Sequence, residues 1–434
     1  MTYLLVLLFF YLQYFLPFVF EYRTLGFLVL TFLLYIFRRF DRVALYILLV
    51  ILIFSIFSSS LSSSNMSIPI EEKDLSGLYG TVVTEPNRKK HRYTGCTVLI
   101  ESVVNRRGDF FSASGRVYVI GPDLGATKGD RIYIEGTMTE SYFLSSGGTV
   151  TEASPCGKLR RKVNALLIRH LPQGNTGNLI ALLLTGTTLD GDSALQDSVR
   201  ELGLSHLLSL SGMHLGYISA FVLPVLALFL SKRKAKSVKD LILMIFVYLA
   251  GLRPSLVRSL IFVILIPFFG IDYSFILSLV FLLKLFPYYV GEVATVLSFT
   301  SLAGILFIAR PQKFLEERNI PFLSGVGVSV LTSIAATVAS APIVYSVFGT
   351  WQPYSFLFSI VGMPVISLLF LLTVVRFIIP KSDVIIEFIL EIVSKSDVLS
   401  RYFPLTSSFE AYYPLVCSLA VTVGVLMLLE RRRK

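Results

Sequence analysis

Long runs of apolar residues alternate with short polar segments over most of the chain. Most of these runs approach or exceed the roughly 20 residues that an α-helix needs to cross a bilayer. They cover residues 3–20, 24–37, 43–57, 205–231, 237–252, 255–270, 273–287, 291–309, 322–348, 353–379 and 411–429. The pattern predicts a polytopic α-helical membrane protein with about 10–11 spans. A further run, at 384–403, is compatible with a poor span or with an interfacial helix.

Residues 66–155 break this pattern, because polar and β-branched residues increase and no apolar run is long enough to span. Strands are predicted there at 78–85, 93–104, 115–121 and 131–140. Short strands at this spacing are typical of a small β-barrel, and an OB fold is the natural candidate. We therefore expect N-terminal transmembrane helices, an OB-like domain after the third helix, interfacial helices and a C-terminal transmembrane domain, at 1–57, 66–155, 156–204 and 205–434.

The interfacial region is predicted from two amphipathic patterns. Residues 158–171 carry apolar side chains on one helical face and basic ones elsewhere, which is typical of a helix lying on a membrane surface. Residues 192–204 predict a second surface helix with Leu195, Val199 and Leu202 on one face. The apolar helix expected between them, at 178–188, is too short to cross alone.

The placement of positive charge predicts the orientation. Only 15% of the residues are charged, and the mean hydropathy is +0.73. The basic segments at 38–42, 232–236 and 310–318 are expected to be cytoplasmic loops, which places the OB-like domain on the other side. Such loops account for part of the net charge of +11, so that charge alone is weak evidence for a nucleic-acid partner.

Two of the three cysteines lie in the predicted extracytoplasmic region. Cys96 falls on a predicted strand, and Cys156 lies where the OB-like domain ends. Disulfides persist in oxidising compartments, so these residues are candidates for a disulfide.

The stretch "HLLSLSGMHLG" (206–216) places polar groups at the head of a predicted span. Intramembrane ionisable residues usually face a bundle interior or a water-filled cavity. Two interpretations stay open: the side chains bond neighbouring helices, or they line a polar path. The candidates are His206, Ser209, Ser211, Gly212 and His214.

The stretch "GLRPSLVRSL" (251–260) contains a second anomaly. Proline interrupts the apolar pattern, and a helix that restarts there leaves free N–H groups that suit an anion. The candidates are Arg253, Pro254, Ser255 and Arg258. An alternative for Arg253 is that its side chain extends to the membrane interface.

Basic and aromatic residues occur together in two loops of the predicted OB-like domain. Such combinations hold single-stranded nucleic acid by charge and base stacking. The alternative is a pair of ordinary solvated loops. The candidates are Arg88, Lys89, Lys90, Arg92, Tyr93, Arg106, Arg107, Phe110 and Phe111.

The sequence contains none of the catalytic patterns that we sought. There is no "GxxxxGK[ST]", no close cluster of histidine and aspartate, and no nucleophile elbow. We therefore expect neither an enzyme nor a bound metal or cofactor.

Four segments resemble the ComEC-type competence protein family. They are "LLTGTTLDGD…VRELGLSHLLSLSGMHLGYIS", "GLRPSLVRSLI", "GEVATVLSFTSLAGI" and "APIVYSVFGTWQPYSFLFSIVGMPVISL". Glu292, Val293, Ala294 and Gly362 depart from the family's residues. The resemblance implies a multi-pass channel in the bacterial cytoplasmic (inner) membrane that passes single-stranded DNA during natural transformation.

The resemblance also implies partners. Many members end in a metallo-β-lactamase-like domain, whose histidines are not found in this sequence, so a separate nuclease is expected. A separate cytoplasmic ATPase or helicase would supply the motor, and receptor or pilus components would deliver DNA outside. The sequence leaves a homo-oligomer open.

These observations give one leading hypothesis and two rivals. In the first, the OB-like domain receives the strand, and arginines and polar side chains at helix breaks line its path through the lipid bilayer. In the second, the chain is a structural or envelope-assembly protein whose polar residues only join helices. In the third, it transports a smaller anion.

Overall fold

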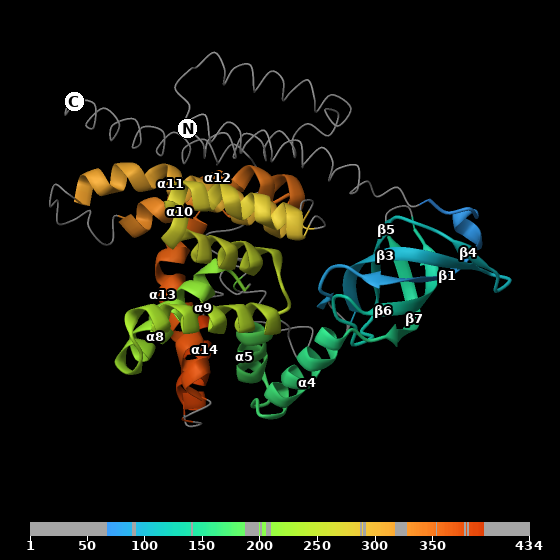
Figure 1. The fold of residues 1–434 in the computed structure, drawn as a ribbon, viewed down its shortest axis with the longest axis horizontal. Coiled ribbons are helices and arrows are strands. Elements are labelled where there is room, and N and C mark those ends of the chain that lie inside the picture. Colours follow the sequence, from blue (N-terminus) through green and yellow to red (C-terminus); the bar gives the residue numbers. More distant parts are fainter. Residues whose placement is uncertain are drawn as a thin grey trace, which may run out of the picture.

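The computed structural model describes residues 67–88, 93–139, 142–186, 199, 202–204, 210–286, 289, 292–316, 328–352, 354–376, 379 and 382–394. Over these residues a β domain lies beside a group of helices, and one helix, α4, lies between them (Figure 1). The predicted spans at 3–20, 24–37, 43–57 and 411–429 are outside the described residues.

The β domain consists of one sheet whose strand pairings return to their starting point. Its elements are η2 (Glu72–Asp74), β1 (Leu75–Val82), β2 (Asn87–Arg88), β3 (Tyr93–Asn105), β4 (Phe110–Ser112), β5 (Arg116–Pro122), β6 (Arg131–Met138) and β7 (Phe143–Glu152). The pairs β1–β3, β3–β5, β6–β7 and β1–β6 are antiparallel, whereas β5–β7 is parallel. The four predicted strands correspond to β1, β3, β5 and β6, and β7 was not predicted.

The β domain has an apolar core of its own. Alternate residues of the strands point inward, and Leu78, Val98 and Phe143 have no exposed surface. Each such side chain contributes about 1.5–3 kcal/mol when it is fully buried. The alternation read from the sequence therefore becomes the packed interior of this domain.

Cys96 belongs to that core, and the predicted disulfide is wrong. Its side chain is 8% exposed and its thiol is free. The expectation of an oxidising compartment says only that a disulfide would persist there, not that the two cysteines lie within reach of each other. The alternation of β3 directs this side chain inward among Val98, Val119 and their neighbours.

The Cys96 thiol is expected to react very slowly in the folded protein. Burial, with a smaller contribution from the negative charge of Glu85, raises the pKa of this thiol to about 12. The thiolate is the reactive form, and it is scarce at pH 8. Iodoacetamide labelling followed by mass spectrometry should modify Cys96 only after denaturation. Rapid labelling of the native protein at this position would contradict the buried placement.

Helix α4 (Pro155–Arg169) confirms the helix predicted at 158–171 and attaches it to the β domain. The Ser154 hydroxyl accepts a hydrogen bond from the N–H of Gly157, at 3.0 Å, and begins the helix. Arg160 and Arg161 form ion pairs with Glu85 and Asp130 of the β domain. These two basic residues were predicted only to lie away from the apolar face, and the structure shows that they tie α4 to the β domain.

Residues after α4 form a short buried helix and a partly described segment. Helix α5 (Asn175–Thr185) has 11 residues, too few to cross a bilayer, as predicted. Of the second predicted surface helix, Val199 and Leu202 are described, and both are buried in the same cluster as α5.

The remaining elements are helices. They are α8 (Gly212–Phe229), α9 (Lys232–Leu249), α10 (Pro254–Leu285), α11 (Val293–Glu316), α12 (Val328–Phe348), α13 (Ser355–Arg376) and α14 (Asp383–Ser394). Four segments within the described residues are long and apolar enough to cross a membrane: Gly212–Phe229, Pro254–Leu282, Val330–Phe348 and Ser355–Arg376. The fold is therefore that of a helical membrane protein with a β-sheet domain toward its N-terminus.

Some predicted boundaries agree with the observed ones and others differ. The label α10 covers two helices that meet at a break at Gly270, with φ 71°, where the predicted runs at 255–270 and 273–287 also separate. The basic segment at 232–236 forms the first turns of α9 instead of a loop. Helix α11 likewise continues to Glu316, into the predicted loop at 310–318. Of the run at 384–403, the described residues form α14, and residues 395–403 lie outside the described part of the chain.

Candidate functional site

The N-terminal ends of α8 and α10 meet inside the helical domain. The Ser255 hydroxyl donates to the carbonyl of Leu210, immediately before α8, at 2.8 Å. Pro254 occupies the first turn of α10, where its missing N–H costs nothing. Helix N-termini carry unpaired N–H groups and a partial positive charge. We call this meeting point the polar junction; its residues are Ser211, Gly212, Ser255, Arg258 and Ser259.

A glycine permits the close approach at the polar junction. A Cβ atom placed on Gly212 would overlap Ser259 Oγ and lie 3.3 Å from the Arg258 guanidinium. Gly216, one turn later on α8, has no heavy atom within 4 Å of such a Cβ. Of these two glycines, only Gly212 lies where a side chain would meet another helix of the described residues.

Arg258 has the most unusual environment of the predicted residues. It is 7% exposed, its Nε donates to Ser298 Oγ and its Nη2 to Ser259 Oγ, each at 2.7 Å. Its guanidinium lies 5.6 Å from the centre of the Phe299 ring. The buried Nη1 has no hydrogen-bond partner. Within the described part of the chain no carboxylate forms an ion pair with it, so its charge is held by hydroxyls and a ring alone.

His214 is fully buried and has at least one structural role. Its Nδ1 accepts a hydrogen bond from the N–H of Ser211, at 3.2 Å, which completes a capping box at the start of α8. Its ring meets Phe370 edge-on, with 5.1 Å between ring centres. Nε2 is buried without a partner. The Nδ1 bond thus lies within α8 itself and caps its first turn; it is not a bond between neighbouring helices.

Arg253 is oriented toward α5. Its guanidinium donates to the carbonyl of Gly186, the residue that ends α5. Gly186 has φ 70°, and a Cβ there would overlap the guanidinium, so glycine suits this position for two reasons. A cation at the C-terminal end of a helix is favourable. Arg253 therefore caps α5, whereas His206 and Ser209 lie outside the described residues.

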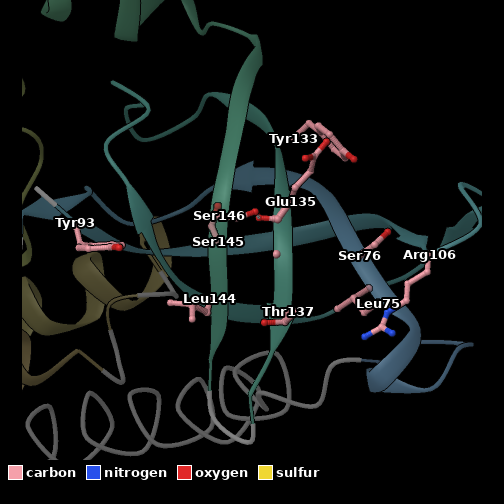
Figure 2. A pocket seen from close by; sticks show the side chains of 11 residues that line it. Leu75, Ser76, Tyr93, Arg106, Tyr133, Glu135, Thr137, Leu144, Ser145 and Ser146 are labelled. Atoms are coloured by element: carbon pink, nitrogen blue, oxygen red, sulfur yellow. Dashed lines mark hydrogen bonds between the residues drawn. The ribbon is translucent and has the colours of Figure 1, made fainter.

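A groove of about 570 Å³ runs over the β domain (Figure 2). Tyr93 and Arg106, both predicted, lie at opposite ends of its lining, and Tyr133 and Glu135 project from β6. Phe110 is 65% exposed, whereas Phe111 packs against the core. Arg106 and Arg107 are exposed; for Arg88 only the backbone is described, and Lys89, Lys90 and Arg92 are outside the described residues.

Sequence reasoning missed two aromatic residues beside Phe110. The Tyr79 ring lies 5.7 Å from that of Phe110 and 4.4 Å from that of Tyr133. Tyr79 and Tyr133 face each other in the β1–β6 register. The signal was present, because alternation within "LYGTVV" and "RIYIEG" places both tyrosines on the outward face.

Comparison with known proteins gives one result for the helical part. A family model described as "Competence protein" matches residues 183–433, which is more than half of the 434 residues. No curated protein matches the chain. Among the described residues, no group of three histidine, cysteine, aspartate or glutamate side chains could hold a metal ion.

Proposed function

This chain belongs to the competence protein family, and from that premise we propose that it is the membrane channel through which one DNA strand enters the cytoplasm. Membership supports a part in DNA uptake, and the apolar helices support a membrane location. The more specific part of the proposal is that a single strand passes through this chain, and this part rests on the polar junction.

The observation that carries the proposal is the unpaired charge of Arg258. An arginine at the centre of a span costs roughly 2.5–3.5 kcal/mol on insertion scales, and Arg258, in the second turn of α10, costs less than that. Such a charge is usually offset by an acidic partner or a wet path. Arg258 has hydroxyl partners and a free Nη1, but no ion pair among the described residues. A passing phosphate group would supply the missing negative charge beside two helix N-termini.

The β domain is proposed to be an OB-like receiver for the strand. Its pairings run from β1 through β3, β5, β7 and β6 back to β1, with one parallel pair, which suits a five-stranded OB barrel. Such domains bind single strands by stacking bases on aromatic rings beside basic side chains. Tyr79, Phe110 and Tyr133 offer the rings, and Arg106 and Arg107 the charge.

We further propose that this domain lies outside the bacterial cytoplasmic membrane and that α4 rests on the bilayer. Leu159 and Leu166 of α4 are 55% and 57% exposed, as on a helix whose apolar side meets lipid. A separate ATPase or helicase would draw the strand inward, and a separate nuclease would remove the other strand.

Binding of single-stranded DNA to the full-length protein in lipid nanodiscs tests the receiving role. Replacing Arg106 and Arg107 by alanine should weaken binding to all sequences and reduce the slope of log K against log salt by about 1.4, or 0.7 per lost phosphate contact. Phe110→Ala should cost about 1–3 kcal/mol of binding, the usual worth of one stacked base. Fluorescence anisotropy measures both.

The matched control is Lys234→Ala, which removes an exposed cation from α9 in the helical domain. It should leave both affinity and salt slope unchanged. If the arginine and phenylalanine variants bind as tightly as the wild type, these residues form ordinary solvated loops and another surface must receive the strand.

One rival function has a specific observation in its favour. Arg253 and His214 each complete a helix end, and Ser359 and Thr373 donate to carbonyls one turn back in α13. Arg253 connects two helices, and the other three bonds satisfy polar groups within one helix, as a structural membrane protein requires. Arg258 is the residue that separates the two functions.

A further inference from the structure

A half-buried lysine of the β domain contacts the helical domain. Lys128 lies in the segment between β5 and β6, and its Nζ donates to Tyr289 Oη at 2.8 Å. The same Nζ lies 4.5 Å and 4.3 Å from the ring centres of Phe286 and Tyr289, which are stacked with 9° between their planes. The cation thus rests on two aromatic rings and on one hydroxyl.

The hydroxyl of Tyr289 makes a second contact that leads to the polar junction. Oη donates to the carbonyl of Leu252. Leu252 has φ 50°, the one positive φ of a non-glycine residue in the described chain, and Gly251 before it has φ 99°. A leucine in this conformation is strained and persists only where its surroundings hold it. The next residue, Arg253, occupies the backbone position immediately before the first turn of α10.

A second β-domain residue contacts the same backbone turn. A Cβ placed on Gly251 would lie 3.1 Å from Cγ of Glu85, whose carboxylate is paired with Arg160 of α4. The side chains of Glu85 and Arg160 are only 12% and 13% exposed. The β domain therefore contacts the turn before α10 at two neighbouring positions, Gly251 and, through Tyr289, Leu252.

We propose that Tyr289 is a positioning residue: its hydroxyl ties Lys128 of the β domain to the carbonyl of Leu252 and so fixes where α10, with Ser255 and Arg258, begins. The receiving domain and the polar junction are then mechanically connected through one side chain. The link to DNA passage rests on the proposed function, whereas the positioning itself does not.

The electrostatics of this contact distinguish Tyr289 from an ordinary packing residue. Burial lowers the pKa of Lys128 to about 8. The negative charges of Glu85 and Glu292, which also face it, act in the other direction and raise that pKa. Burial raises the pKa of Tyr289, so its hydroxyl stays protonated and keeps donating to Leu252. Removing only that hydroxyl would take a hydrogen-bond partner from the half-buried Lys128 ammonium and from the Leu252 carbonyl, and a partner lost in this way typically costs about 1–3 kcal/mol.

The sign of the pH dependence follows from the lowered pKa. The docked form holds the Lys128 proton less tightly than a solvated lysine, whose pKa is about 10.4. Docking therefore releases a proton between pH 8 and that value, and becomes more favourable as pH rises through this range. Below pH 8 Lys128 is charged in both forms, and its docking contribution does not change with pH.

Hydrogen exchange of the full-length protein in nanodiscs, without DNA, tests the inference. The readout is the exchange rate of peptides that cover residues 250–260. Tyr289→Phe keeps both rings stacked and should speed exchange there by about tenfold or more, since the Lys128 ammonium and the Leu252 carbonyl each lose a hydrogen-bond partner. The matched control Tyr217→Phe removes a hydroxyl on α8 for which the described residues give no hydrogen bond, and should exchange as the wild type.

Two further results are specific to the proposed arrangement. Lys128→Met in the Tyr289→Phe background removes the unpaired charge and should restore part of the slow exchange. The excess exchange of Tyr289→Phe over the control should also shrink between pH 7 and pH 9, as Lys128 becomes neutral. Wild-type exchange in Tyr289→Phe would overturn the inference. Faster exchange in the double variant than in Tyr289→Phe alone would also overturn it. Both outcomes are independent of any DNA-uptake measurement.

Discussion

Arg258→Leu is expected to abolish DNA passage while the protein still inserts and accumulates. Leucine removes the buried charge but keeps an apolar side chain of substantial size beside Phe299. Insertion should become easier, by less than the roughly 2.5–3.5 kcal/mol that an arginine at the centre of a span costs, since Arg258 lies in the second turn of α10. The strand's phosphates would then meet a low-dielectric wall without a counter-charge. Entry of labelled DNA into the cytoplasm, normalised to the amount of protein in the membrane, measures the effect.

Arg258→Lys is the matched comparison. Lysine retains the charge but not the planar group that donates to Ser298 and Ser259 together, so partial passage is expected. If Arg258→Leu passes DNA normally, the arginine does not act on the strand. If that variant instead fails to accumulate, Arg258 is a structural tie and the structural rival gains support.

Gly212→Val is expected to separate α8 from α10 and to stop DNA passage as well. Even a Cβ at this position overlaps Ser259 Oγ and crowds the Arg258 guanidinium. Overpacking in a closely packed interior typically lowers the free energy of unfolding by about 1–3 kcal/mol, and we expect a loss of this size. The accompanying backbone shifts would move the two sides of the polar junction apart. Thermal unfolding of the purified protein and the same uptake measurement report the two consequences.

Gly216→Val provides the internal control for this prediction. It places the same side chain on the same helix, one turn later, where a Cβ meets nothing within 4 Å. Unfolding and uptake should both stay close to those of the wild type. Equal defects in the two variants would mean that valine disturbs α8 itself and that the close approach at Gly212 is unimportant.

The sequence predicted four strands of the β domain and missed three: the short strands β2 and β4, and the long strand β7. β1, β3, β5 and β6 contain apolar residues at alternate positions, and that alternation follows from burial on one face. β7 contains "SSGG", which reads as a loop. Gly148 is needed because a Cβ there would overlap the backbone carbonyl of Tyr133 on β6. Close strand approach depends on partners distant in sequence, so no local pattern announces it.

Among the candidate site residues, the sequence identified unusual positions but not their individual roles. Breaks and polar residues in apolar runs drew attention to His214, Arg253 and Arg258, and all three are largely buried. Hydropathy could not show that Arg253 caps α5, because Gly186 lies 67 residues earlier. It also could not find Tyr289, whose role depends on contacts with Lys128 and Leu252 from two other parts of the chain.

The central claim is that this chain carries DNA across the membrane. The most direct measurement follows end-labelled DNA into the cytoplasm of cells from which the gene is deleted, beside cells that carry it again. The account predicts that label stays outside in the deletion and that wild-type protein restores entry, whereas Arg258→Leu does not. Equal entry of label with and without the gene would contradict it.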